Sequence, residues 1–159
     1  MLADLRAIYS RDIATIGREV AAYTTDAALW EPLEGTTNPG GTLALHLVGN
    51  LQHFIGTVLG GSDFVRDRDG EFGRRDLTRA ELGAQVAQTA DVVDRTLASL
   101  APQRLAEEFP VVIAGRKLST GRALLHLLAH LAYHLGQLDY HRRAVNGSGT
   151  VGAMGLDAL

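Results

Sequence analysis

The sequence contains no cysteine, which excludes several kinds of chemistry at once. Without thiols there is no disulfide framework, no thiolate metal site and no cysteine nucleophile, so a metal ion would need nitrogen or oxygen ligands. A chain without cysteine is compatible with a reducing compartment. Charged residues interrupt the first segment at Asp4, Arg6, Arg11 and Asp12, where a signal peptide would be apolar, and we therefore expect a cytoplasmic protein.

The sequence also lacks an excess of basic charge and long apolar runs. The formal net charge is −3, and no basic stretch alternates with aromatic residues, which argues against partners such as nucleic acid or an anionic membrane. No apolar segment is long enough to span a bilayer. The 159 residues, 46% of them hydrophobic, suit one globular domain with a sizeable core.

Helical periodicity predicts an all-α protein. Apolar residues recur at helical spacing over residues 2–23, 43–59, 78–102 and 120–143. Thr78 and Glu81 have the spacing of a capping box, which predicts the start of the third helix. The polar, glycine-rich residues 60–77 predict a surface crossover long enough to span a bundle. Together these features predict a four-helix bundle with one long crossover loop.

Two further segments complete the chain. Residues 107–120 are expected to form a short hairpin that turns at Ala114 and Gly115, with Pro110 restricting any strand to an edge. After the fourth helix the chain is rich in glycine and has little helical periodicity. We therefore expect a bundle over residues 1–145 and a C-terminal tail over residues 146–159.

The fourth helical segment carries four of the six histidines. Because an α-helix has 3.6 residues per turn, His126, His130 and His134 lie on one stripe about 6 Å apart, and two neighbours can share a metal ion. A catalytic zinc site typically uses three protein ligands. The second helix offers His46 or His53, which are too far apart along the axis to reach the same ion.

Two registers remain open if these helices are antiparallel. In one, His46 meets His130 and His134, and His53 lies near His126. In the other, His53 meets His126 and His130, and His46 lies towards His134 and His141. Spacing alone favours the first register only slightly.

Other residues have ordinary interpretations beside functional ones. Five polar residues are close enough in sequence to hydrogen-bond the metal ligands, or to serve only at the helix surface: Asn50, Tyr133, Gln137, Asp139 and Tyr140. Four arginines offer an anion site, although we expect solvated charges in weak ion pairs: Arg66, Arg68, Arg142 and Arg143.

Several metalloprotein classes do not fit the sequence. Residues 130–134, HLAYH, lack the glutamate of HExxH metallopeptidases, and no Glu-x-x-His pair of the di-iron carboxylate bundles occurs. Haem held by two histidines is a further alternative, and it predicts a coloured protein.

The segments NPGGTLALHLVGNLQHFIG and LLAHLAYHLGQLDYHRR resemble the second and fourth helices of the DinB-like (damage-inducible) superfamily, in a branch of unknown function. LWEPL and VRDRDGEF extend the resemblance over nearly the whole chain. The resemblance implies an up-down-down-up bundle, often a homodimer, with a divalent metal ion held by His46, His130 and His134. Some relatives are thiol S-transferases that use low-molecular-weight thiols.

We therefore expect a divalent-metal-binding protein with a three-histidine site, as a metal-dependent thiol S-transferase or a hydrolase. Zinc is the first choice of metal, and nickel, iron or manganese also suit imidazole ligands. The alternatives are a non-catalytic bundle in which the ion or the histidine cluster is structural, and a dimeric stress-related binding protein. An open coordination position that faces a pocket would favour the enzyme.

Overall fold

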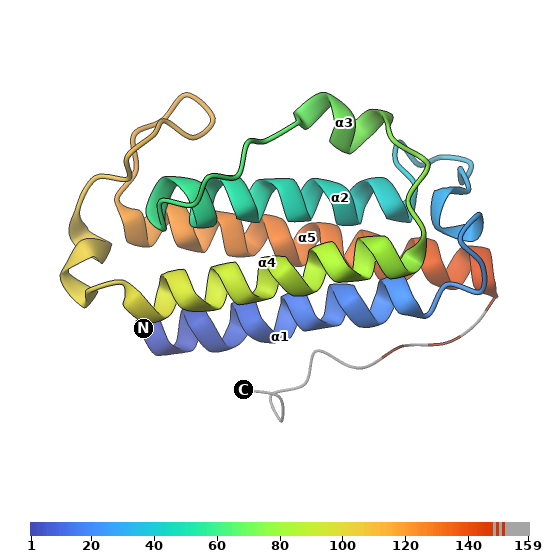
Figure 1. Cartoon of the computed structure of the whole chain (residues 1–159), viewed down its shortest axis with the longest axis horizontal. Helices are drawn as coiled ribbons and strands as arrows, with labels where there is room; N and C mark the ends of the chain where they lie inside the picture. Colours follow the sequence, from blue (N-terminus) through green and yellow to red (C-terminus); the bar gives the residue numbers. More distant parts are fainter. Residues whose placement is uncertain (148, 150, 152–159) are drawn as a thin grey trace.

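Four long helices pack side by side, as the all-α bundle prediction required (Figure 1). The computed structural model describes residues 1–147, 149 and 151. The long helices are α1 (Leu2–Ala21), α2 (Gly40–Leu51), α4 (Arg79–Ser99) and α5 (Thr120–Asn146), and the shorter ones are η1 (Ala28–Trp30), η2 (Gln52–Leu59), α3 (Arg68–Gly73) and η3 (Pro102–Ala106). Within the described part of the chain, no helix combines the length and apolarity of a membrane span.

The direction of each helix decides which residues meet across the bundle. Helices α1 and α5 run one way and α2 and α4 run the other way, which confirms the up-down-down-up topology (Figure 1). Helix α1 packs against α4 and α5, and α2 packs against α5 and α4. Because α2 and α5 are antiparallel neighbours, residues early in α2 lie beside residues late in α5.

Each long helix buries an aliphatic stripe in the common core. Residues three or four apart lie on the same face of an α-helix, so a leucine at each such position gives a continuous apolar surface. The buried stripe of α5 consists of Leu124, Leu127, Leu131, Leu135 and Leu138.

Helix α2 begins at Gly40, three residues before the predicted start, and changes to a π-helix at Gln52. The missing side chain of Gly41 makes room for Trp30, since a Cβ atom there would lie 2.4 Å from the indole ring. In η2 the backbone N–H of Gly60 donates to the carbonyl of Ile55, five residues earlier. Periodicity did not reveal this change of helix type, because a few π-turns shift the apolar positions only gradually.

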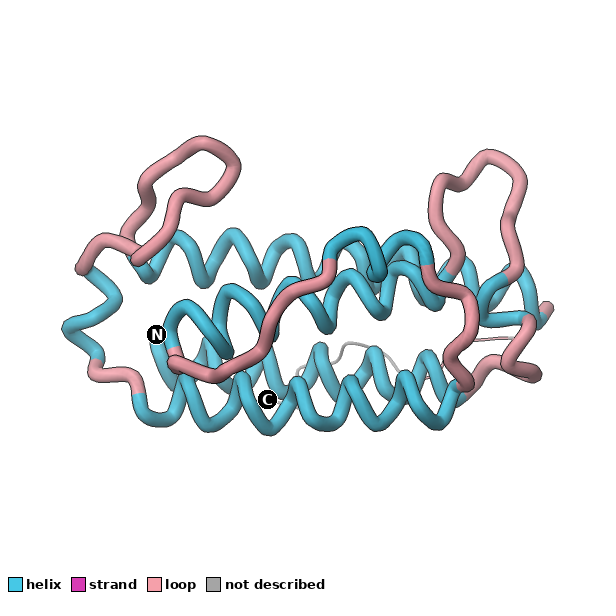
Figure 2. The backbone as a smooth tube through the Cα atoms, turned by 45° about the horizontal axis from the view of Figure 1, so that its top comes forward, coloured by secondary structure: helices cyan, strands magenta, loops and turns pink. Residues whose placement is uncertain are grey.

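The crossover between η2 and α4 is more ordered than the sequence indicated. It passes over α2 and contains the short helix α3, which Figure 2 shows at the surface of the bundle. The carboxylate of Asp67 accepts a hydrogen bond from the backbone N–H of Gly70 at 2.9 Å and so caps α3. The predicted surface crossover is present, but one of its side chains is not at the surface, since Glu71 on α3 is buried.

The remaining boundaries follow local rules. Thr78 and Glu81 form the predicted capping box at the start of α4. The predicted hairpin is present as two isolated antiparallel bridges, and it turns at Ala114 and Gly115, both with positive φ. Helix α5 ends where Gly147 adopts a left-handed conformation (φ 65°). Most of the tail predicted at residues 146–159 lies outside the described residues.

Candidate metal centre

Three histidines from two helices converge at the edge of the core. Helix α2 supplies His46, and α5 supplies His130 and His134. Each residue offers one nitrogen atom, and these atoms all lie within 4.8 Å of one another. The ring centroid of His46 is 5.1 Å from that of His130 and 5.3 Å from that of His134. The structure therefore brings together the same three histidines that the first register paired.

Packing of the two antiparallel helices explains this register. The buried leucines of α5 face the core, and His130 and His134 border that stripe on the side where α2 lies. His46 comes in the second turn of α2, whose residues from Gly40 to Leu51 are all buried. An apolar interface of this kind allows little sliding, because a shift would expose leucines and bury polar groups.

A carboxylate from the crossover determines how the ring of His46 is oriented. The Nδ1 atom of His46 lies 2.9 Å from Oε2 of Glu71. Arg66 donates to both oxygens of the same carboxylate, from Nε to Oε1 at 2.6 Å and from Nη2 to Oε2 at 2.9 Å. Burial acts to raise the pKa of Glu71, but the hydrogen bonds from Arg66 and His46 outweigh burial, and the pKa lies below 4.5.

The proton of the His46–Glu71 hydrogen bond belongs to His46. An ionised carboxylate only accepts hydrogen bonds, so Nδ1 of His46 is the donor, and in the neutral ring Nε2 carries the lone pair. Nη2 of Arg66 also lies 3.4 Å from Nδ1 and would donate to it in the opposite tautomer. The contact of Nδ1 with the Glu71 carboxylate is the shorter of the two, and an ionised carboxylate has no proton to donate. This contact therefore determines that the proton is on Nδ1.

His130 provides a test of whether a cation fits between the rings. Its Nε2 atom lies 3.2 Å from Nε2 of His46, and its Nδ1 atom is buried without a hydrogen-bond partner. A tetrahedral zinc ion with Zn–N distances of about 2.0–2.1 Å places its ligand nitrogens about 3.4 Å apart. The spacing of His46 and His130 and the three-nitrogen donor set therefore fit a divalent ion.

Burial also keeps His130 in the neutral form that a metal ligand requires. The pKa of His130 is lowered to about 4, first by burial and then by repulsion from His134 and His46. The pKa of His134 is lowered by burial as well, although its hydrogen bond to Gln137 acts in the opposite direction. Both rings are thus neutral and able to bind a metal ion at neutral pH.

His134 connects the cluster to a cavity. Its Nδ1 atom lies 2.6 Å from Oε1 of Gln137, which leaves Nε2 as the nitrogen that can bind a metal ion. Next to it, a cavity of about 520 Å³ lies between α5 and the loop that precedes α2. Tyr133, Gln137 and Tyr140 line one wall, and Leu33 and Asn38 belong to the other.

The other histidines lie apart from this cluster. His53 is in η2, where its ring packs against Phe54 at a centroid distance of 4.8 Å, and His126 is exposed on α5. His141 is buried beneath the loop, with Nδ1 2.7 Å from the Tyr23 hydroxyl and Nε2 2.8 Å from the Glu31 carbonyl. The register that pairs His53 with His126 and His130 is therefore not the one that forms.

Two expectations about charged side chains were wrong. Arg142 is not a solvated charge, since it is 1% exposed and pairs with the buried carboxylate of Glu19. Arg66 is also largely buried in its pair with Glu71. By contrast, Arg68 and Arg143 lie over the rings of Phe72 and Tyr140.

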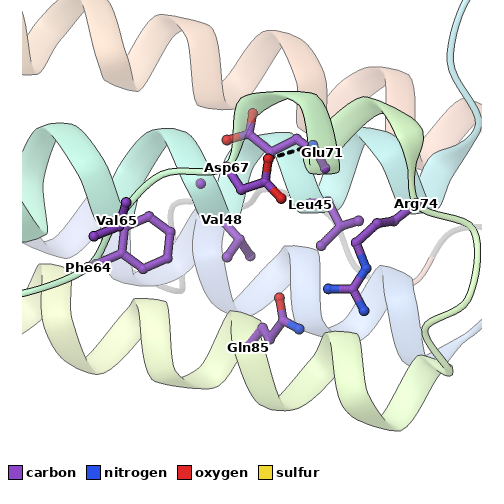
Figure 3. A pocket seen from close by; sticks show the side chains of 10 residues that line it. Leu45, Val48, Phe64, Val65, Asp67, Glu71, Arg74 and Gln85 are labelled. Carbon is purple, nitrogen blue, oxygen red and sulfur yellow. Dashed lines mark hydrogen bonds between the residues drawn. The ribbon is translucent and has the colours of Figure 1, made fainter.

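Gly49 of α2 makes the approach of Glu71 feasible. A Cβ atom on Gly49 would lie 2.0 Å from Oε1 of Glu71, which is much shorter than any real contact. Figure 3 shows Glu71 on α3 above α2, beside a cavity of about 150 Å³ that Leu45 and Val48 help to line. Sequence reasoning missed Glu71 and the role of Gly49. The available signal was Phe72, an aromatic residue among polar neighbours, which indicates that one face of α3 is docked.

Comparison with known proteins identifies a family for most of this chain. The family model of the DinB superfamily matches residues 11–138, which include α2, the crossover and the three clustered histidines. A search of curated proteins finds no match.

Proposed function

This chain belongs to the DinB superfamily, and on that basis we propose that it is a divalent-metal-dependent enzyme whose ligands are His46, His130 and His134. The observation that carries the proposal is the convergence of three imidazole nitrogens, one of them from His134, which also lines a cavity. Zinc suits this ligand set best, and nickel, iron or manganese are alternatives.

The number of ligands supports catalysis over a structural role. Structural zinc sites are closed by four protein ligands, whereas catalytic sites keep one position open. Among the described residues, the group that could hold an ion has three histidines and no fourth histidine or carboxylate. When bound, a divalent ion supplies positive charge that lowers the pKa of a water or thiol ligand.

The cavity beside His134 supports a small-molecule substrate. Its volume of about 520 Å³ falls within the usual range for ligand sites. The rings of Tyr133 and Tyr140 offer stacking surfaces, and Gln137 and Asn38 offer hydrogen bonds. We propose a thiol S-transferase acting on a low-molecular-weight thiol, or a hydrolase that uses water. The cytoplasm, where thiols stay reduced, is the compartment that suits the first activity.

The experiment compares zinc-loaded protein with chelator-treated protein, each incubated with low-molecular-weight thiols and an electrophilic acceptor. We expect consumption of the thiol only by the zinc-loaded protein, and loss of that activity in His134→Ala. A parallel set with ester and amide substrates tests the hydrolase.

Equal rates with and without zinc in both sets would contradict the enzyme. The structural alternative makes a separate prediction, because an ion that only stabilises the bundle raises the melting temperature without supporting turnover.

A further inference from the structure

The crossover between η2 and α4 contributes to the candidate metal centre through Glu71. We propose that Glu71 is a positioning residue that holds the proton of His46 on Nδ1, so that Nε2 presents its lone pair to the metal ion. This inference rests on the proposed function, since it concerns a residue that acts on one of the proposed ligands.

Hydrogen-bond geometry gives Glu71 this role. The carboxylate is 6% exposed and receives three hydrogen bonds, two from Arg66 and one from Nδ1 of His46. Each donor is 2.6–2.9 Å away, which is typical of charge-assisted bonds. With Nδ1–H committed to Glu71, Nε2 of His46 points its lone pair towards His130, 3.2 Å away.

Several contacts hold the carboxylate in place. The bidentate pair with Arg66 fixes its plane, and the cap from Asp67 to Gly70 fixes the start of α3. The ring of Phe72 packs against His46 at a centroid distance of 5.1 Å. Gly49 leaves the space that Oε1 occupies. Glu71 is thus held rigidly enough to orient its neighbour.

A purely structural role for Glu71 makes a different prediction. The contact between Glu71 and His46 also ties the crossover to α2, and a tether alone would not require the proton of His46 to stay on Nδ1. The variant Glu71→Gln distinguishes the positioning role from the purely structural one. The amide keeps the shape of the side chain but has a single acceptor oxygen, and Nη2 of Arg66 is already 3.4 Å from Nδ1 of His46. Arg66 can then donate to Nδ1 and drive the proton to Nε2.

Nitrogen chemical shifts of the histidine rings in metal-free protein report the tautomer directly. We expect the Nδ1–H tautomer at His46 in the wild type and a shift towards Nε2–H in Glu71→Gln. The matched control is Asp69→Asn, which removes the same charge from an exposed position of α3 and should leave the spectrum of His46 unchanged. An Nε2–H tautomer in the wild type, or equal tautomers in the wild type and Glu71→Gln, would overturn the inference.

Zinc titration by calorimetry gives the second readout. Loss of a group that orients a ligand typically weakens metal binding by about 10- to 100-fold, and we expect this range for Glu71→Gln. Gly49→Ala should weaken zinc binding in the same range, because the added Cβ displaces Glu71. Alanine has a higher helix propensity than glycine, so the substitution does not disfavour α2 itself. Asp69→Asn should bind zinc as the wild type does.

The outcomes separate this inference from the proposed function. If the wild type binds zinc and both Glu71→Gln and Gly49→Ala bind it equally tightly, the positioning role is overturned and the proposed function stands. If the wild type binds neither zinc nor nickel, iron or manganese, the proposed function fails, and the positioning role fails with it.

Discussion

At the scale of single residues, burial rather than net charge controls the histidines. His130, His134 and His141 all have lowered pKa values, and burial is the largest cause for each. The first two are neutral beside one another, which suits ligands of a common cation. His141 is neutral for another purpose, since it joins α5 to the segment between α1 and α2 through Tyr23 and Glu31.

His141 makes the stability of the fold depend on pH. Its pKa lies below the 6.5 of an unfolded histidine, so the unfolded chain binds the proton more readily. This contribution to stability is complete above pH 6.5 and is lost as the pH falls towards the folded-state pKa. We expect the free energy of unfolding in urea to decrease more steeply for the wild type than for His141→Gln between about pH 7.5 and about pH 5.

Glutamine can still donate to the Glu31 carbonyl and accept from Tyr23, so the variant should fold, with a loss of about 1–3 kcal/mol if one bond remains unmade. His130 and His134 lower stability in acid in both proteins and cancel in the comparison. Equal slopes for the two proteins would refute the role assigned to His141.

At the scale of helices, α5 contributes both to the core and to the candidate metal centre, and its buried and exposed leucines should respond differently to truncation. Leu131 is fully buried in the core, whereas Leu125 on the same helix is 50% exposed. We expect Leu131→Ala to lose about 2–5 kcal/mol of unfolding free energy, and Leu125→Ala to lose less than about 1 kcal/mol. Urea unfolding measures both values, and similar losses would show that the core has been assigned to the wrong face of α5.

The long helices could be predicted because their signals are local and repeated. Leucines at spacings of three and four, the capping box at Thr78 and the turn at Ala114–Gly115 each depend on a few neighbouring residues. Helix α3 and the π-helix η2 could not be predicted in the same way. Helix α3 is six residues long and depends on docking against α2, and η2 differs from an α-helix by small shifts that periodicity does not resolve.

The candidate site was predictable only in part for the same reason. Spacing placed His130 and His134 on one stripe, but it could not decide between His46 and His53, because the register depends on how the leucines of α2 and α5 interlock. The sequence could indicate through Phe72 that α3 is docked, but it could not reveal the contact of Glu71 with His46, which joins separate elements and requires the space above Gly49.

At the scale of the whole molecule, the outer face of α5 leads us to propose a homodimer, as the family resemblance implies. Leu125, Tyr133 and Tyr140 are exposed on this face, with the small residues Ala129 and Gly136 between them. Small residues let two helices approach closely, and exposed aromatic residues are typical of interfaces. Sedimentation velocity should give twice the chain mass of 17.0 kDa, and Tyr133→Glu should shift the protein towards monomer. A wild type that sediments as a monomer at tens of micromolar would refute this proposal.

The central claim is that His46, His130 and His134 hold one metal ion between two antiparallel helices. The direct measurement is the metal content, by mass spectrometry, of zinc-treated and dialysed protein. We expect about one zinc ion per chain in the wild type, in His53→Ala and in His126→Ala, and a loss of most of it in His46→Ala, His130→Ala and His134→Ala. If His46→Ala, His130→Ala and His134→Ala all retained zinc, or if only His53→Ala lost it, these three histidines would not be the ligands.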